Sequence, residues 1–313
     1  MEQLSLFPLD ADPANDVSRT SRSDQRLRCS TPDTSFGTAL PSHEKARLLD
    51  QFYTCNEVAK ELFDWFSGQF AEHDLGSSNA PVFMEPSAGE GAFLRLLPPG
   101  SLAFDIDPQG PGIVEADFLR LPLRRSGHLV VIGNPPFGKN ASLAIRFFNH
   151  AARAASVIAF IVPLTFQKVS VQNRLDLRLH MLAETPVPKD SFMFEGKRKH
   201  VPATFQIWVR KPVIRQKIVL PKTHAEFQFL EPADTHEADF AMQRVGAAAG
   251  RVHHDLKAKP SAHYFLKAAP GIEDLEAVMR ALDFQSLAKR TSGKPSLAKT
   301  EVVQLYTQKR RAI

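Results

Sequence analysis

Short apolar runs alternate with helix-like patterns through the middle of the 313-residue chain. The run Val157–Val162 contains only apolar residues, which is typical of a strand buried on both faces of a sheet. Strands are expected at Val82–Met84, Leu102–Phe104, Ile113–Val114, Leu129–Ile132 and Val157–Val162. Helices are expected at Glu57–Phe70, Ala92–Leu97, Ala141–Ala155 and Val169–Leu182. The alternation predicts an α/β fold with a parallel sheet that helices cover on both faces.

Two local patterns mark the ends of this region. Thr54 and Glu57 have the spacing of a capping box, which predicts that the first helix begins directly after Thr54. Near the other end, the strands Phe192–Phe194 and Thr204–Val209 flank a basic loop and are expected to pair as a hairpin. We therefore assign residues 44–212 to one domain.

The segments on either side differ in composition. Residues 1–43 include 20 Ser, Thr, Asp or Pro and show little apolar periodicity, so a flexible leader is expected. Prolines and polar residues follow Lys211, and further helical patterns occur at Glu273–Phe284 and Leu297–Thr307. Residues 213–313 are therefore expected to form a second, smaller α+β unit.

Charge also distinguishes the two ends of the chain. The whole sequence carries 39 Lys and Arg against 34 Asp and Glu, but residues 241–313 carry 13 against 6. A basic C-terminal unit indicates a polyanionic partner such as nucleic acid, and the alternative is a solvated basic face.

The overall composition excludes several classes of protein. With 43% hydrophobic and 23% charged residues, the chain is neither wholly disordered nor collagen-like. No apolar run approaches the roughly 18 residues of a membrane span, so no membrane association is expected. Cys29 and Cys55 are too few for a disulfide framework, and the histidines lack the spacing of metal ligands. We expect a cytoplasmic protein without a metal.

A glycine-bearing segment follows the first predicted strand of the sheet. The sequence EPSAGEGAF places Gly89 and Gly91 between that strand and a helical pattern. Glycines at such a turn let the backbone approach a ligand, and the amides of a helix start can meet a phosphate or carboxylate. Leu94 replaces the third glycine of a dinucleotide fingerprint, so a purely structural turn is the alternative.

Carboxylates follow the next two predicted strands. Asp105 comes after the second strand, and Asp117 with Phe118 comes after the third. In a doubly wound sheet, an acid at the end of the second strand can bind ribose hydroxyls. An acid beside an aromatic ring can meet the edge of an adenine. Each acid alone could be an ordinary cap, but three such features in strand order favour a nucleotide-like ligand.

The fourth strand leads into the sequence IGNPPFG. Two prolines stiffen the turn after Asn134 and remove two backbone donors, which leaves carbonyl oxygens as acceptors. The Asn134 side-chain oxygen and the Pro135 carbonyl together suit an amino group with two hydrogens, and Phe137 offers a ring face. For an isolated motif of this kind, a rigid turn is the alternative.

In this order, the motifs resemble those of class I S-adenosylmethionine-dependent methyltransferases, most of all adenine-specific DNA methyltransferases of the gamma arrangement. The resemblance covers roughly Gln51–Arg210 and includes QFYT, EPSAGEGAF, FDIDP, ADFL, IGNPPFG and IVPLTF. It implies a Rossmann-like seven-stranded methyltransferase sheet and S-adenosylmethionine as cofactor. It implies cofactor-binding roles for Tyr53, Thr54, Glu85, Ser87, Gly89, Asp105, Ile106, Asp117 and Phe118. It implies catalytic roles for Asn134, Pro135, Pro136 and Phe137.

Two positions depart from the family pattern. Cys55 stands where proline is usual after Tyr-Thr, which should alter the entry to the first helix without removing Thr54. Phe137 replaces the commoner tyrosine, so ring stacking is expected to remain without the hydroxyl.

The resemblance also implies the reaction, which is methyl transfer to the exocyclic amino group of adenine in DNA. The target base must be flipped or unpaired, because pairing hides that amino group. Lys197, Arg198 and Lys199 lie in the basic loop and are expected to contact phosphates, with solvated charge as the alternative. RNA adenine would use the same pocket. Two more hypotheses are methylation of a protein glutamine and an inactive module that binds nucleic acid.

Overall fold

The computed structural model describes residues 52–76, 80–125, 127–291 and 293–311. The leader predicted for residues 1–43 and the cysteine at position 29 lie outside these residues, as does Gln51 of the first motif.

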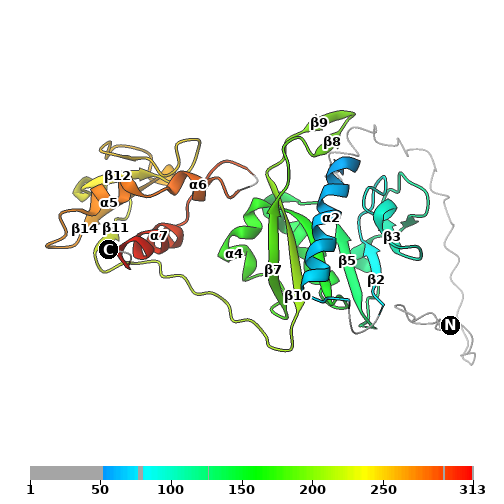
Figure 1. The fold of residues 1–313 in the computed structure, drawn as a ribbon. Coiled ribbons are helices and arrows are strands. Elements are labelled where there is room, and N and C mark those ends of the chain that lie inside the picture. Colours follow the sequence, from blue (N-terminus) through cyan, green and yellow to red (C-terminus); the bar gives the residue numbers. More distant parts are fainter. Residues whose placement is uncertain (1–51, 77–79, 126, 292, 312–313) are drawn as a thin grey trace, which may run out of the picture.

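The central element is a seven-stranded sheet (Figure 1). Its strands are β2 (Val82–Glu85), β3 (Leu102–Asp105), β4 (Val114–Glu115), β5 (Leu129–Gly133), β6 (Val157–Pro163), β7 (Leu179–Pro186) and β10 (Ala203–Arg210). They lie in the order β4-β3-β2-β5-β6-β10-β7. The predicted α/β class and Rossmann-like seven-stranded sheet are confirmed, with one correction to the expected parallel sheet. Strand β10 is antiparallel to both of its neighbours, so the sheet is mixed.

Apolar cores on both faces explain the uninterrupted apolar strands. All five residues of β5 are buried, and Leu129–Ile132 alternate between the two cores. Val131 packs with Ile145 and Phe148 of helix α3 (Ser142–Ala151). Val130 packs on the opposite face with residues of helix α2 (Asn56–Glu72), which crosses the sheet in Figure 1. Burial on two faces removes the polar positions that an exposed strand face would show.

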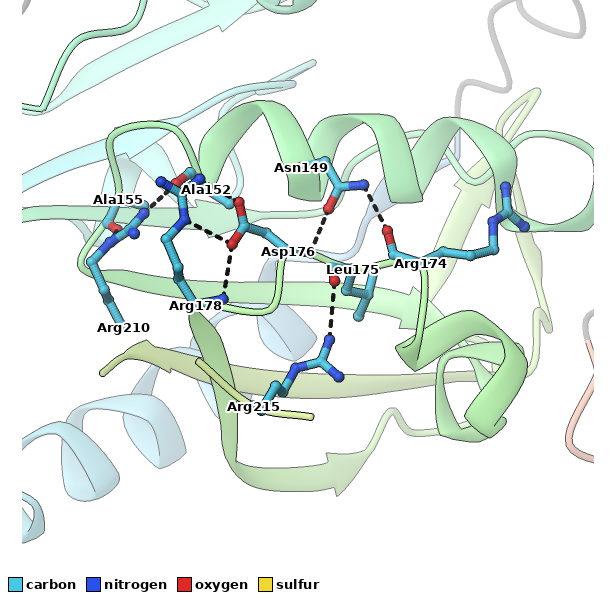
Figure 2. A network of polar contacts seen from close by, with 9 residues as sticks. All are labelled: Asn149, Ala152, Ala155, Arg174, Leu175, Asp176, Arg178, Arg210 and Arg215. Atoms are coloured by element: carbon cyan, nitrogen blue, oxygen red, sulfur yellow. Dashed lines mark hydrogen bonds and ion pairs between the residues drawn. The ribbon is translucent and has the colours of Figure 1, made fainter. Parts of the chain in front are cut away.

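The helix predicted over Val169–Leu182 is wrong in its second half. Helix α4 covers only Val169–Gln172, and Leu179–Pro186 forms edge strand β7 beside β10. Between them, the Asn149 side chain donates to the Arg174 carbonyl at 2.9 Å and accepts from the Asp176 amide at 2.8 Å (Figure 2). A side chain from α3 thus binds two backbone groups that a continuous helix would use internally.

Arginine side chains fasten the chain where it leaves the large sheet. Arg210, at the end of β10, donates to the carbonyls of Ala152 and Ala155 (Figure 2). Arg215 donates to the carbonyls of Leu179 and Leu175 at 2.9 and 3.1 Å. These bonds hold the first residues after the sheet against its outer edge.

Two other local predictions fail because of pairing with distant segments. The capping box is wrong: Cys55 is the N-cap of α2 and makes no side-chain capping bond. Thr54 instead belongs to strand β1 (Tyr53–Thr54), which pairs with β8 (Phe192–Phe194). The predicted hairpin is wrong as well, because β8 pairs with β1 and β9 (Lys197–Lys199) in a separate three-stranded sheet.

Several predicted helices are shorter than expected. The pattern at Ala92–Leu97 yields only the 3-10 helix η1 (Leu94–Leu96). The pattern at Ala141–Ala155 begins with the 3-10 turn η3 (Lys139–Ala141) and ends in α3 at Ala151. The remaining 3-10 helices are η2 (Phe118–Arg120), η4 (Leu164–Gln167), η5 (Thr235–Glu237) and η6 (Pro260–Ala262).

The C-terminal part is a smaller α+β unit, as predicted. Its four-stranded antiparallel sheet contains β11 (Phe227–Phe229), β12 (Phe240–Gln243), β13 (Val252–His253) and β14 (His263–Ala268). Its helices are α5 (Leu275–Ala281), α6 (Phe284–Ala288) and α7 (Lys299–Arg311), so the helix predicted at Glu273–Phe284 is interrupted. Met242 and Tyr306 are fully buried in its core. The domain boundary between residues 212 and 213 stays a prediction.

Candidate active site

A cavity of about 280 Å³ opens at the carboxyl ends of strands β2, β3 and β5. The chain passes from β2 outward through β3 and β4, then crosses to β5 and β6 on the other side of β2. Ligands of open α/β sheets bind where the strand order reverses in this way. The cavity is lined by Phe52, Tyr53, Thr54, Glu85, Pro86, Ser87, Ala88, Gly89, Glu90, Ala92, Asp105, Ile106, Ala116, Asp117, Phe118, Leu119, Asn134, Pro136, Leu143, Arg146 and Phe147.

This lining includes all nine residues expected to bind the cofactor, together with Asn134 and Pro136. They come from the ends of four strands and from β1, which enters the site by pairing with β8. The sheet therefore gathers segments spread over more than 80 positions of the sequence into one cavity.

The turn after β2 requires glycine at position 89. Gly89 has a φ of +52°, and a β-carbon placed there would lie 2.6 Å from atoms of the Tyr53 ring. Its amide donates to Asp105 Oδ2 at 2.7 Å, and the Asp107 amide donates to Asp105 Oδ1 at 2.8 Å. Asp105 therefore holds the glycine turn in place while it also lines the cavity.

Glu85 at the end of β2 is only 2% exposed. Its Oε2 accepts a hydrogen bond from the Leu94 amide at 2.7 Å, which ties the end of the strand to η1. Burial raises the pKa of Glu85 well above its usual value, and the neighbouring Asp105 acts in the same direction. The Glu85 carboxyl group therefore stabilises the turn through its hydrogen bond to Leu94 and also lines the cavity.

Tyr53 and Thr54 bring the N-terminal motif to the cavity. Burial, with Asp105 and Asp107, raises the pKa of Tyr53 to about 12, so its hydroxyl stays protonated at neutral pH and can donate a hydrogen bond. The hydroxyl oxygen of Thr54 is buried and has no hydrogen-bond partner among the described residues. A buried polar atom of this kind is expected to find a partner when a ligand fills the site.

The residues after β3 and β4 differ in how exposed they are. Ile106 is 54% exposed and offers an apolar surface to the cavity. Asp117 accepts from the Leu119 amide at 3.0 Å and so caps η2, which is the structural role considered for it. Phe118 is 1% exposed, and its ring stacks on Phe147 at 5.3 Å between centroids. Phe118 is therefore a core residue as well as part of the cavity wall.

Asn134 has an unusual hydrogen-bonding arrangement. Its Nδ2 donates to the Phe52 carbonyl at 2.9 Å, and its own carbonyl accepts from Ser87 Oγ at 3.0 Å. Its side-chain oxygen Oδ1 is buried and has no partner within the residues that the structure describes. An unsatisfied buried acceptor costs about 1–3 kcal/mol of stability, so the lack of a partner for Asn134 Oδ1 calls for an explanation.

A second, smaller pocket of about 20 Å³ lies on the other side of Asn134. Its lining is largely aromatic and proline: Phe52, Asn134, Pro135, Pro136, Phe137, Phe192 and Val201. The rings of Phe137 and Phe192 are nearly perpendicular, at 82° and 6.5 Å between centroids. Phe52, Asn134 and Pro136 line both cavities and therefore form the wall between them.

Several residues of these walls were assigned no role from the sequence, among them Phe52, Phe192 and Arg146. Phe52 directly precedes the recognised Tyr-Thr pair, and its proximity to the motif was a usable signal. Phe192 was identified only as part of a strand, and pairing with β1 brings it to the site. Arg146 of α3 lines the larger cavity, and no sequence signal marks it.

The three basic residues of β9 do not line either cavity. Lys197, Arg198 and Lys199 are exposed, and Arg198 lies 3.7 Å from Glu57. Lys199 is paired with Phe192, which is paired in turn with Thr54. One row across the three-stranded sheet of β1, β8 and β9 thus contains a residue of the larger cavity, a residue of the smaller pocket and an exposed cation.

The described residues contain no group of three or more His, Cys, Asp or Glu side chains suited to a metal ion. None of the helices that the structure describes is both long and apolar enough to cross a membrane.

No protein-family model matches this chain, and no curated protein matches it. Among solved structures, a candidate RNA methyltransferase from Pyrococcus horikoshii is 17% identical, with a TM-score of 0.39 over 56% of this chain and 93% of that one. Protein 1320 of Thermoplasma acidophilum is 17% identical, with a TM-score of 0.31 over 46% and 83%. Magnesium protoporphyrin IX methyltransferase from Synechocystis, solved with bound S-adenosylmethionine, is 12% identical, with a TM-score of 0.34 over 49% and 79%.

Proposed function

We propose that this protein transfers a methyl group from S-adenosylmethionine to the exocyclic amino group of adenine in DNA. The observation that carries this proposal is the side chain of Asn134. Its amide nitrogen is engaged by the Phe52 carbonyl, while its oxygen is buried without a partner in the wall between two cavities. A fixed, unsatisfied acceptor beside an aromatic pocket suits an amino group carried by a planar ring.

The larger cavity fits the proposed cofactor. Asp105 offers carboxylate oxygens where ribose hydroxyls are bound in doubly wound sheets, and Ile106 offers an exposed apolar side chain for a base. The unpartnered hydroxyl of Thr54 supports a polar ligand beside the glycine turn. Bound there, S-adenosylmethionine would supply an electrophilic methyl group. Tyr53, Glu85, Ser87, Gly89, Asp117 and Phe118 complete the proposed binding site.

The smaller pocket, which at about 20 Å³ is too small for a whole base, is the proposed site of the amino group of the target base. Asn134 Oδ1 and the Pro135 carbonyl would each accept one hydrogen of the amino group. This arrangement directs the nitrogen lone pair away from both acceptors and toward the larger cavity. Fixed positioning and preorganised dipoles then supply most of the catalysis. Asn134 is neutral and a poor base, so the proton displaced from nitrogen leaves to water after the methyl group is transferred.

A nucleic-acid substrate is supported by the exposed cations of β9, one residue pair away from the aromatic pocket. Phosphate contacts from Lys197, Arg198 and Lys199 would hold the strand whose base enters the pocket. RNA is the second candidate, because an unpaired adenine of RNA presents the same amino group to this pocket.

The decisive experiment uses methyl-labelled S-adenosylmethionine with separate pools of single-stranded DNA, duplex DNA, RNA and protein extract. We expect label in DNA, recovered as N6-methyladenine by mass spectrometry of the nucleosides. Matched oligonucleotides that lack adenine are the control and should remain unlabelled. Label confined to RNA would favour the second candidate. Label in protein, or in none of the pools, would contradict the proposal.

A further inference from the structure

A chain of three residues leads from the outside of the site to the orientation of Asn134. The ring of Phe194 stacks on the ring of Phe52, with 4.9 Å between centroids and 27° between planes. The Phe52 carbonyl accepts the hydrogen bond from Asn134 Nδ2 at 2.9 Å. Phe194 lines neither cavity, so it touches neither proposed ligand.

The hydrogen bond to the Phe52 carbonyl determines which way the Asn134 side-chain amide is turned. The two ends of an asparagine side chain have almost the same shape, but one donates two hydrogens and the other accepts. With Nδ2 held by Phe52, the oxygen is the end without a partner among the described residues. A flipped amide would present N–H groups to an amino group that also donates, which would repel the substrate.

The position of Phe52 depends on few backbone bonds. Phe52 precedes β1, a strand of only two residues whose pairing with β8 ends at the Tyr53–Met193 pair. The Cys55 amide adds a bond to the Ser191 carbonyl at 2.9 Å. A ladder of this length constrains its last residue weakly, so the ring stack with Phe194 is a large part of what fixes Phe52.

We propose that Phe194 is a positioning residue of the active site, which acts through Phe52 to hold the Asn134 amide in its accepting orientation. This inference rests on the proposed methyl transfer for its catalytic meaning. The orientation of the amide itself can be measured without turnover, so the two proposals can fail separately.

The kinetic test compares Phe194→Ala and Phe194→Tyr with the parent protein. Misplacement of a catalytic group by about 1 Å can cost on the order of 100-fold in rate, so we expect kcat of Phe194→Ala to fall about 10- to 100-fold. The dissociation constant of S-adenosylmethionine should stay within about threefold, because Phe52 is only one of the many residues that line the larger cavity. Phe194→Tyr retains the stacked ring and should recover most of kcat.

A matched control separates positioning from general loss of packing. Phe63 of α2 is half-buried like Phe194, has a ring contact of its own with Phe66, and lines neither cavity. Phe63→Ala should lower the melting temperature about as much as Phe194→Ala but leave kcat near that of the parent protein. An equal fall of kcat in both variants would overturn the inference.

The second measurement is independent of activity. In protein labelled with ¹⁵N-asparagine, the side-chain signals of Asn134 can be assigned by their loss in Asn134→Ala. We expect Phe194→Ala to shift these signals and to speed their hydrogen exchange, with Phe194→Tyr close to the parent protein. Unchanged signals in folded Phe194→Ala would overturn the positioning role, whatever the protein methylates.

Discussion

The large seven-stranded sheet and the small sheet of the C-terminal unit, formed by β11 to β14, bury their strands in different ways. In the large sheet, every residue of β5 and β6 is buried, and apolar cores cover both faces. In the small sheet, the main core around Phe240 and Tyr306 covers one face, and only Ala238, Ala241 and Phe265 form a described buried cluster apart from it. When both faces of a sheet are covered, ligands can reach it only at the ends of its strands. When mainly one face is covered, the other face is open to partners.

The charges of the two regions differ in a related way. Three acids at or just after the ends of β2, β3 and β4 line the cavity, namely Glu85, Asp105 and Asp117. In the C-terminal unit, some basic side chains form ion pairs with acids of the same unit, for example Arg310 with Glu226 and Asp274. Across residues 213–313 the balance is 16 Lys and Arg against 11 Asp and Glu, smaller than the excess in residues 241–313 alone. We therefore propose that the first region carries the chemistry and that the second contributes a supporting surface.

The largest expected effect tests whether the chemistry belongs to the large sheet. Asn134→Ala should lower methyl transfer roughly 100- to 1000-fold, because one preorganised hydrogen-bonding group is lost. Affinity for S-adenosylmethionine, measured by calorimetry, should change only a few-fold. Asn173→Ala is the control, since Asn173 bonds Ile218 far from both cavities. Activity near that of the parent protein in Asn134→Ala would remove the catalytic assignment.

The next effect concerns cofactor binding at the glycine turn. Gly89→Ala combines a left-handed backbone with a clash against the Tyr53 ring, so we expect S-adenosylmethionine to bind at least about tenfold more weakly. Gly112→Ala is the control, because Gly112 also has a positive φ but has open space where a β-carbon would lie. Equal cofactor affinity in the two variants would mean that the Tyr53 contact does not shape the site.

Salt dependence shows which region binds nucleic acid. Replacing Lys197, Arg198 and Lys199 with Ala should reduce the slope of log affinity against log salt by about 2–3 for a duplex. Replacing Lys257, Lys259 and Lys289 tests the C-terminal surface in the same titration. A reduction of the slope only in the second variant would mean that the C-terminal unit, and not β9, is the main nucleic-acid-binding region. An unchanged slope in both would mean that these charges are solvated.

One ion pair joins the two regions. Lys168 lies 3.1 Å from Glu301 and also donates to the Ser296 carbonyl, with both charged side chains mostly buried. Lys168→Met should lower the free energy of unfolding by about 1–3 kcal/mol, because the Glu301 carboxylate loses its cation. Lys299→Met, which removes an exposed pair with Glu231, should cost less than about 0.5 kcal/mol. If Lys168→Met and Lys299→Met lowered the free energy of chemical unfolding equally, the Lys168–Glu301 pair would not be a structural link between the two regions.

The last effect concerns pH. The raised pKa of Glu85 means that the folded chain keeps a proton that the unfolded chain releases. Stability should therefore fall as the pH rises above the ordinary carboxyl range, by up to about 1.4 kcal/mol per pH unit until the folded pKa is passed. Glu85→Gln should remove this component of the slope in urea unfolding at pH values above the ordinary carboxyl range. The exposed Glu115→Gln variant should keep the slope of the parent protein.

The resemblance of the short motifs anticipated most of the cavity wall. All nine expected cofactor residues line it, because each follows a strand of the sheet or belongs to the paired N-terminal segment. The expected phosphate contacts of β9 and the division of the chain into domains stay predictions. Phe52, Phe192 and Arg146 were missed, since their places depend on strand pairing and helix packing rather than on local spacing.

The sequence alone determined which segments are buried strands and where ligand-type residues follow them. Continuous apolar runs and turn residues are local signals, and they need no partner to be recognised. The tertiary structure decided that Leu179–Pro186 is an edge strand, that β8 pairs with β1, and that Asn134 presents its oxygen. Each of these results depends on a partner far away in the chain, such as Phe52 for Asn134 across 82 positions. Local propensity is weak compared with such contacts, and only the folded chain brings them together.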